Sequence, residues 1–172
     1  MSVVEAVATL LPQEDDRLHH AVAVAYKQAF HRLRAAGQID EPLYDGIVPV
    51  LDALTSAGWL LGVATGKSDR GLGLALAHHG LTDRFMTLQT ADRHPSKPHP
   101  SMIEVAMAEA GVTPAATVMI GDTSFDMAMA RAAGVRALGV AWGYHPVAEL
   151  YAAGAHAVAM APAQLADLME DA

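Results

Sequence analysis

Two carboxylates spaced four residues apart carry the strongest chemical signal in the sequence. The apolar run 118–120 ends at Gly121, and Asp122 and Asp126 follow before a stretch rich in alanine and methionine. This order predicts a buried strand that delivers Asp122 to the carboxyl edge of a sheet, where open α/β sheets bind their ligands. If a helix begins between the two residues, both carboxylates can face the same cleft.

Two interpretations of this pair stay open. Close carboxylates repel each other unless a cation or a basic group lies between them, and a hard divalent cation such as Mg²⁺ meets that need. Alternatively, Asp122 caps the helix and Asp126 lies in its first turn, where a negative charge suits the helix dipole. The first interpretation predicts a metal site, whereas the second predicts only the start of a helix.

A second segment places anion-binding groups at the end of another predicted strand. The apolar residues 60–64 lead into Thr65, Gly66, Lys67 and Ser68. A hydroxyl group and backbone N–H groups at such an edge suit an anion such as phosphate. An ordinary junction between a strand and a capped helix has the same appearance, so this segment alone does not identify a site.

A lysine between two prolines is the third candidate. Lys97 lies between Pro95 and Pro98, which stiffen the loop before a helix that begins near Ser101. A lysine held in place can serve as the counter-charge of a phosphate, although a loop lysine can equally be solvated. Of the nine histidines, His99 and His145 are the ones of interest, because they flank Lys97 and the end of the predicted strand before Trp142.

In their order and spacing, these segments resemble the motifs of the haloacid dehalogenase superfamily, in its phosphoglycolate-phosphatase-like branch. Thr65 matches the family's second motif, a serine or threonine that ends a strand. Lys97 matches the third, a lysine before a helix, in the Lys-Pro-x-Pro setting of this branch. Residues 121–126 match the fourth, Gly-Asp-x-x-x-Asp, and the likeness covers residues 40–145 in detail.

The resemblance implies phosphoryl transfer from a small phosphorylated metabolite through an aspartyl-phosphate. In this sequence it implies that Asp122 binds Mg²⁺ and that Asp126 helps, directly or through water. It implies that Thr65 and the Gly66 amide bind the transferred phosphoryl group. Lys97 would hold both the phosphate and the charge of the nucleophile, so Lys97 and Thr65 are the catalytic candidates.

One motif of the family is missing from the sequence. The family's nucleophile and its general acid/base are the two aspartates of Asp-x-Asp-x-Thr, and no Asp-x-Asp occurs in the 172 residues. We therefore expect a Mg²⁺-dependent phosphatase represented by an N-terminally truncated chain that lacks the nucleophile. The alternative is a non-catalytic remnant that keeps a phosphate or Mg²⁺ site, or only an interaction surface.

The predicted fold is α/β, with a Rossmann-like, mostly parallel sheet flanked by helices. Residues 1–42 are expected to form a partial helical cap and residues 43–172 an incomplete hydrolase core. The predicted strands cover residues 59–64, 85–89, 117–120, 136–141 and 157–160. In the family, the missing first strand lies between the strand that ends at Thr65 and the one that ends at Gly121. Both strands would then have an unpaired edge, so we expect self-association or a loosened core.

Composition limits the possible partners. A net charge of −8 and a pI near 5.5 argue against a nucleic-acid partner. The absence of cysteine excludes disulfides and fits a reducing compartment. The N-terminus lacks the features of a signal peptide, and the longest apolar runs are too short to span a bilayer. A cytoplasmic protein without a membrane partner is expected.

Overall fold

The computed structural model describes residues 3–37 and 41–170, and the chain divides into two compact units. The first unit, Met1–Pro42, contains the helices α1 (Val3–Leu10) and α2 (Asp16–Ala35), which pack against each other. The side chain of Asp15 accepts a hydrogen bond from the Leu18 amide at 2.8 Å and so caps α2. This unit is therefore a helical hairpin with a capped second helix.

The second unit, Leu43–Ala172, alternates strands with helices, as predicted for an α/β fold. Its strands are β1 (Gly62–Thr65), β2 (Thr87–Thr90), β3 (Val118–Gly121), β4 (Arg136–Val140) and β5 (Ala157–Ala159). Its helices are α3 (Ile47–Ser56), α4 (Asp69–His78), α5 (Ser101–Ala110), α6 (Ser124–Ala132), α7 (Val147–Ala153) and α8 (Gln164–Glu170), with a short 3-10 helix over Pro114–Ala116.

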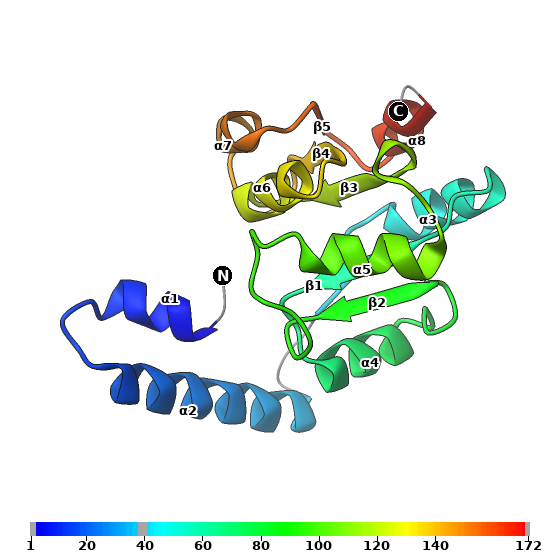
Figure 1. Cartoon of the computed structure of the whole chain (residues 1–172). Helices are drawn as coiled ribbons and strands as arrows, with labels where there is room; N and C mark the ends of the chain where they lie inside the picture. Colours follow the sequence, from blue (N-terminus) through cyan, green and yellow to red (C-terminus); the bar gives the residue numbers. More distant parts are fainter. Residues whose placement is uncertain (1–2, 38–40, 171–172) are drawn as a thin grey trace. The chain divides into compact units, whose positions relative to one another are not determined.

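The strands form two parallel sheets, one of β1 and β2 and the other of β3, β4 and β5 (Figure 1). Gly62 lies opposite Thr87 in the first sheet. In the second, Val118 lies opposite Arg136, and Leu138 lies opposite Ala157. Among the residues described, no backbone pairing joins β1 to β3, so each of these two strands is an edge strand.

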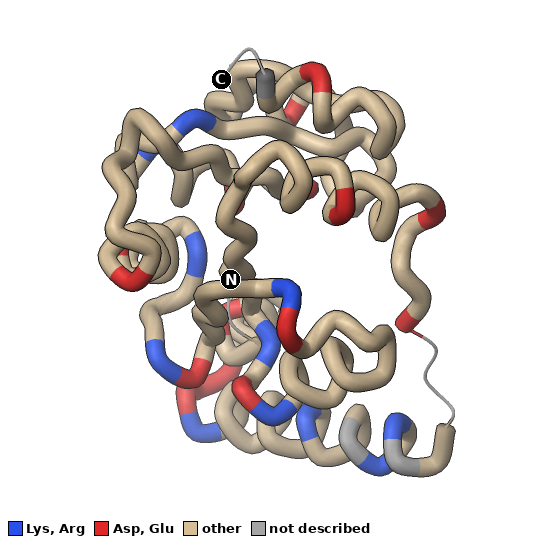
Figure 2. The backbone as a smooth tube through the Cα atoms, turned by 90° about the vertical axis from the view of Figure 1, so that its right-hand side faces the viewer, with Lys and Arg blue, Asp and Glu red and all other residues tan. Residues whose placement is uncertain are grey.

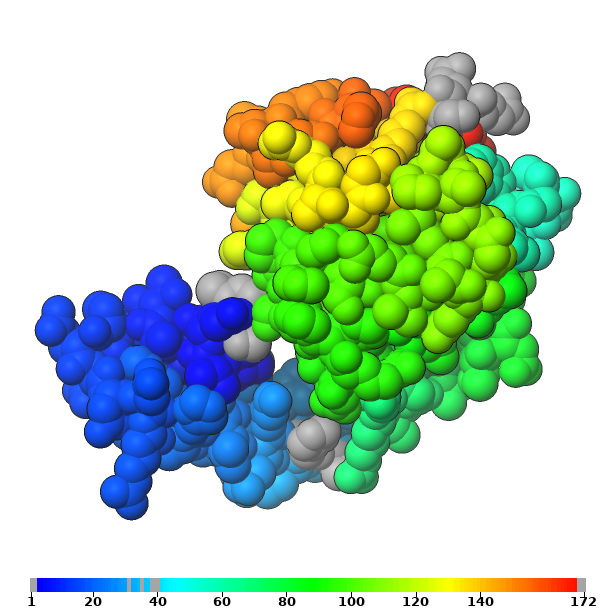
Figure 3. Space-filling view, viewed as in Figure 1, coloured from blue at the N-terminus to red at the C-terminus, as the bar shows by residue number. Residues whose placement is uncertain are grey.

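Helices cover both faces of the sheets. Met119 of β3 and Ala137 of β4 pack into an apolar cluster with α5 and α6, which lie side by side on the face shown in Figure 3. The neighbouring residues Ile120 and Leu138 turn the other way, into a cluster with α3 and α8. This alternation has the two-residue period of a strand that is covered on both faces.

The strands carry almost no charge, as expected for strands of a buried parallel sheet. Figure 2 shows long stretches of the backbone without Lys, Arg, Asp or Glu. Of the five strands in the described part of the second unit, β4 alone contains a charged residue, Arg136. Burial nevertheless differs between them. Residues 137–140 of β4 are buried, whereas the residues of β1 and β3 are only partly buried or exposed. The two edge strands therefore leave apolar surface incompletely covered.

The expected strand at residues 59–64 is shorter than predicted. The ladder with β2 begins only at Gly62. Before it, the Leu61 carbonyl accepts a hydrogen bond from the Met86 amide at 2.8 Å, and the Trp59 amide donates back to the Leu54 carbonyl of α3 at 3.0 Å. Leu60 is 57% exposed. Hydrophobicity alone predicted a strand here, but a strand also needs a ladder partner, and the ladder with β2 includes no residue before Gly62.

None of the helices within residues 3–37 and 41–170 combines the length and the hydropathy that a membrane crossing requires.

Candidate functional site

Lys97 connects the carboxyl ends of the two sheets. It lies in the loop between β2 and α5, and its Nζ donates to the Ala64 carbonyl oxygen at 2.9 Å and to Asp126 Oδ1 at 2.6 Å. Ala64 belongs to β1, and Asp126 belongs to α6, the helix after β3. The side chains of Lys97 and Asp126 are only 17% and 5% exposed. The ends of β1 and β3 therefore meet at a shielded, charge-assisted hydrogen bond.

Asp126 also fixes the start of α6. Its Oδ2 accepts hydrogen bonds from the Thr123 amide at 3.1 Å and the Thr123 hydroxyl at 2.7 Å, which completes a capping box. Thr123 is the N-cap, so the interpretation in which Asp122 caps this helix is wrong. Asp126 does lie in the first turn, and it has a second function as the partner of Lys97.

Gly121 makes room for this arrangement. A Cβ atom added at Gly121 would overlap the side chain of Asp126, whose carboxylate must reach both Thr123 and Lys97. Packing thus explains why the strand ends in glycine immediately before the two aspartates.

Asp122 faces the loop that follows β4. Its Oδ2 accepts a hydrogen bond from the Tyr144 amide at 3.0 Å, and its backbone carbonyl accepts one from the His145 amide at 3.1 Å. A Cβ added at Gly143 would overlap the Asp122 side chain, so the loop backbone approaches this carboxylate closely. Asp122 and Asp126 therefore lie near the same sheet edge but have different neighbours.

Thr65 and Gly66 form the end of β1 on the other side of Lys97. The Thr65 hydroxyl oxygen accepts a hydrogen bond from the Lys67 amide at 3.1 Å, which leaves its hydrogen to donate to an anion. Gly66 is exposed, and no atom lies within 4 Å of the position that a Cβ would occupy. The turn then enters α4, where Ser68 caps the helix by accepting from the Gly71 amide at 3.1 Å.

The two histidines near the site differ in their surroundings. His99 Nδ1 accepts a hydrogen bond from the Ser101 amide at 3.2 Å and so supports the start of α5. His145 Nδ1 lies 3.2 Å from the Ser124 hydroxyl and 3.1 Å from Glu149 Oε2. In the sequence, the one sign that His145 lies near Asp122 is that it follows the predicted strand 136–141.

The carboxylate of Asp122 is better placed to bind a metal ion than the carboxylate of Asp126. Both carboxylate oxygens of Asp126 accept hydrogen bonds from protein groups, whereas among the described residues Asp122 accepts them only at Oδ2 and at its backbone carbonyl. Within the described ranges, no group of three or more histidine, aspartate or glutamate residues is arranged to hold a metal. A hard cation at Asp122 would need further oxygen ligands from water, from a phosphate or from another carboxylate.

Comparisons with known proteins identify the family. The model of the haloacid dehalogenase-like hydrolase family matches residues 2–140. The probable phosphatase IndB of Dickeya dadantii is 39% identical over 145 residues, which cover 83% of this chain. A phosphoglycolate phosphatase of Xylella fastidiosa is 32% identical over 139 residues, 80% of this chain. The chain belongs to the haloacid dehalogenase-like hydrolases, in their phosphoglycolate-phosphatase-like branch.

Solved structures confirm the fold. The structure of a predicted phosphatase from Clostridium acetobutylicum matches with a TM-score of 0.85 at 24% identity, and the match covers 99% of this chain and 78% of that protein.

The match with the Dickeya relative covers 62% of that protein, and the match with the Xylella relative covers 59%. The chain therefore spans about three fifths of the length of these two relatives.

The Lys97–Asp126 pair allows a test of how the site is held together. Lys97→Met should lower the free energy of unfolding by about 3 kcal/mol, because it leaves the Asp126 carboxylate buried without its counter-charge. In the double variant Lys97→Met/Asp126→Asn, the two losses should not add, because the pair is coupled. Urea unfolding of the single and double variants measures both effects.

The exposed Lys27 provides the matched control for this test. Lys27→Met also removes one lysine, and it should change the free energy of unfolding by less than about 0.5 kcal/mol. Equal losses for Lys97→Met and Lys27→Met would contradict a structural role of the pair.

Proposed function

We propose that this chain carries the phosphate-binding and metal-binding part of a phosphatase that acts on small phosphorylated metabolites through an aspartyl-phosphate. The observation that carries the proposal is the position of Lys97, whose Nζ bonds to β1 and to the helix after β3 at 2.9 and 2.6 Å. A shielded positive charge therefore lies between Thr65 at the end of β1 and the two aspartates, Asp122 and Asp126, that follow β3. The named phosphatases among the relatives support the same class.

Each residue has a separate task in this proposal. Thr65 donates its hydroxyl hydrogen, and Gly66 its amide hydrogen, to oxygens of the phosphoryl group. Lys97 neutralises the charge that the phosphate and an attacking carboxylate bring together. Asp122 holds Mg²⁺ and Asp126 contributes through water, because its own oxygens are occupied by Thr123 and Lys97. When bound, Mg²⁺ neutralises phosphate oxygens that would otherwise repel an anionic nucleophile.

The attacking groups come from outside these 172 residues in our proposal, on a strand that ends in Asp-x-Asp-x-Thr. One carboxylate oxygen attacks phosphorus while the ester P–O bond breaks, and the second aspartic acid gives a proton to the leaving alkoxide. Water then hydrolyses the aspartyl-phosphate and releases inorganic phosphate. In this proposal the chain represents an N-terminally truncated enzyme of the cytoplasm. It has no nucleic-acid partner, because its net charge of −8 would repel a polyanion.

A second candidate is a non-catalytic remnant that keeps only the phosphate or Mg²⁺ site. The absence of Asp-x-Asp from the whole sequence favours it, because loss of the nucleophile and the general acid removes several orders of magnitude in rate. The two candidates differ in what restores activity, and the second of the following experiments separates them.

The metal site predicts weak Mg²⁺ binding by the chain itself. Asp122→Asn should abolish this binding or weaken it at least tenfold, because it removes the charge of the only carboxylate that we assign as a direct ligand. The control is Asp83→Asn, which makes the same charge change at an exposed position away from the site. Isothermal titration calorimetry measures the Mg²⁺ affinity of the wild type, of Asp122→Asn and of Asp83→Asn. Equal affinity of the wild type and Asp122→Asn would refute the assignment.

The proposed mechanism predicts that the chain and an N-terminally extended form of it differ in phosphatase activity. The 172-residue chain should not hydrolyse phosphate esters above background, whereas a fusion that adds an N-terminal strand ending in Asp-x-Asp-x-Thr should show Mg²⁺-dependent release of inorganic phosphate. In the fusion, Lys97→Ala and Asp122→Ala should each lower kcat at least a hundredfold.

A folded fusion without turnover would favour the non-catalytic remnant. Turnover by the unextended chain that Asp122→Ala abolishes would show that the proposed nucleophile is not needed.

A further inference from the structure

A set of polar side chains joins β2 to both ends of α5. Gln89 of β2 is 0% exposed, and its Nε2 donates to Glu109 Oε2 at 2.8 Å and to Thr87 Oγ1 at 2.6 Å. Its Oε1 lies 2.8 Å from His94 Nε2, and His94 Nδ1 lies 2.7 Å from the Ser101 hydroxyl. Ser101 is the first residue of α5, and Glu109 lies in its last turn. We call these five residues the Gln89 network.

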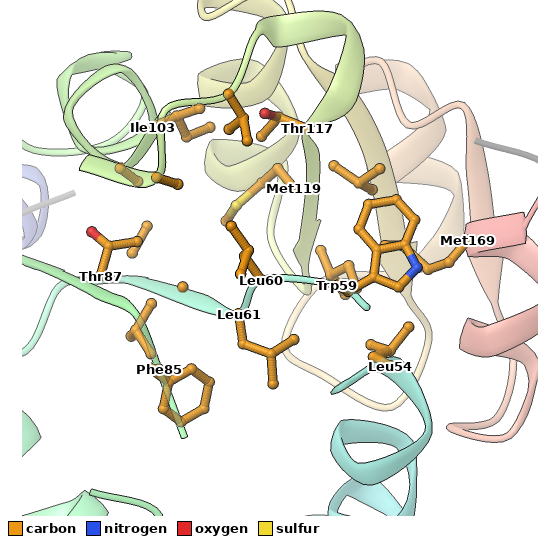
Figure 4. Close-up of a pocket in the computed structure, with 18 of the residues that line it drawn as sticks. Leu54, Trp59, Leu60, Leu61, Phe85, Thr87, Ile103, Thr117, Met119 and Met169 are labelled. Carbon is orange, nitrogen blue, oxygen red and sulfur yellow. The ribbon is translucent and has the colours of Figure 1, made fainter. Parts of the chain in front are cut away.

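The Gln89 network lies beside an apolar cavity of about 480 Å³ between the two sheets (Figure 4). Thr87, which is 5% exposed, borders this cavity, and its methyl group faces β1, because a Cβ added at Gly62 would lie 2.7 Å from Thr87 Cγ2. Its hydroxyl instead donates to Glu109. Polar groups that are shielded from water are costly to leave without partners, so the groups of the network are confined to one arrangement.

The Gln89 network determines which nitrogen of His94 carries the proton. The carboxylate of Glu109 can only accept, so the amide nitrogen of Gln89 must face it. The amide oxygen of Gln89 then faces His94 and accepts from its Nε2–H. With the proton on Nε2, the neutral imidazole accepts at Nδ1 from the Ser101 hydroxyl. A single neutral tautomer of His94 therefore satisfies both neighbours.

His94 fastens together the two ends of the loop that carries Lys97. This loop runs from the end of β2 to the start of α5. His94 Nε2 bonds to Gln89 of β2 and Nδ1 bonds to Ser101 of α5, so one imidazole closes the loop at its base. Two residues separate His94 from Lys97, and one of them is Pro95, whose φ is fixed by its ring. The position of His94 is therefore passed to Lys97 through a short, stiff piece of backbone.

A second contact holds the same loop on the side of α4. Arg93, next to His94, lies 3.0 Å from Asp69 Oδ1, and the same oxygen accepts a hydrogen bond from the Thr90 hydroxyl at 2.8 Å. The side chains of Arg93 and Asp69 are 46% and 53% exposed, so solvent screens this ion pair. The contacts of His94, one of them to the fully buried Gln89, therefore constrain the loop more strongly than the ion pair does.

We propose that His94 is a positioning residue for Lys97 and holds the loop so that the ammonium group reaches Ala64 and Asp126. The bonds of Lys97 Nζ at 2.9 and 2.6 Å end on β1 and α6, so a displacement of the loop moves the ammonium away from both. A misplaced Lys97 would in turn weaken phosphate binding. This last step rests on the proposed function, whereas the position of the ammonium group is independent of it.

The ammonium signal of Lys97 in nitrogen–proton NMR spectra tests the positioning without any ligand. The chain has three lysines, and the signal that disappears in Lys97→Met is that of Lys97. A shielded, hydrogen-bonded ammonium exchanges its hydrogens slowly with water, so we expect the signal in the wild type and its loss in His94→Ala. The matched control is Arg93→Ala, which changes the neighbouring residue of the same loop and should keep the signal.

A residue that only stabilised the fold would give a different result. In that case His94→Ala would lower the free energy of unfolding and leave the Lys97 signal in place. An unchanged signal in folded His94→Ala, its loss in Arg93→Ala as well, its absence from the wild type, or a wild-type imidazole with the proton on Nδ1 would overturn the proposal. If His94→Ala does not fold, Ser101→Ala removes one partner of the imidazole and should weaken the signal, and an unchanged signal would again overturn the proposal.

Calorimetric titration with inorganic phosphate in the presence of Mg²⁺ tests the consequence for binding. His94→Ala should weaken phosphate binding at least tenfold, and Arg93→Ala less than twofold. His94→Gln keeps a donor for Gln89 and His94→Asn keeps an acceptor for Ser101, so each should bind phosphate more tightly than His94→Ala. Unchanged phosphate binding by His94→Ala would overturn the proposal. A wild type that binds no phosphate, but whose Lys97 signal is lost in His94→Ala, would refute the proposed function and support the positioning by His94.

Discussion

The site depends on one hydrogen-bonded charge, the Lys97 ammonium between Ala64 and Asp126. The two sheets share no backbone ladder in the described part of the chain, so nothing in β-pairing fixes the end of β1 against the end of β3. Lys97 supplies a polar link at that point, with one bond to a strand carbonyl and one to a carboxylate. Because both side chains are largely shielded from solvent, the geometry of this link is more strongly constrained than that of a surface ion pair.

The two aspartates divide the work that the sequence pattern assigns to them jointly. Asp126 completes the capping box of α6 with Thr123 and accepts a hydrogen bond from Lys97, while Asp122 presents its carboxylate beside the loop at Gly143 and Tyr144. A single helix start thus positions both the counter-ion of the lysine and the candidate metal ligand. Gly121 is needed for this compactness, since a side chain there would displace Asp126.

Much of the fold was predictable because local signals agree with the tertiary structure. Asp15, a residue type that favours the N-cap position, caps α2, and Gly111 ends α5 in the left-handed conformation at φ 68°. The segment Trp59–Leu61 shows where such signals fail, because its hydrophobicity predicts a strand but the structure gives it no ladder partner. Sheet pairing depends on segments distant in sequence, which periodicity cannot reveal.

The candidate site was predictable as a set of residues but not as a set of interactions. Thr65, Lys97 and Asp126 all lie at one end of the sheets, as the order of strands and helices implies. The bond from Lys97 to Asp126 spans 29 positions, and the contact between Asp122 and the Tyr144 amide spans 22, so neither leaves a local pattern. The capping role of Thr123 was overlooked because Asp122 is an equally good N-cap residue by type.

A titration with inorganic phosphate in the presence of Mg²⁺, followed by amide resonances in nitrogen–proton NMR spectra, tests the central claim most directly. The account predicts saturable shifts at Gly66, Lys97 and Thr123, which surround the meeting point of β1 and β3, and little change in β5 or α8. An absence of saturable shifts at these three residues, or shifts confined to β5 and α8, would contradict the assignment of a phosphate site to this edge of the sheets.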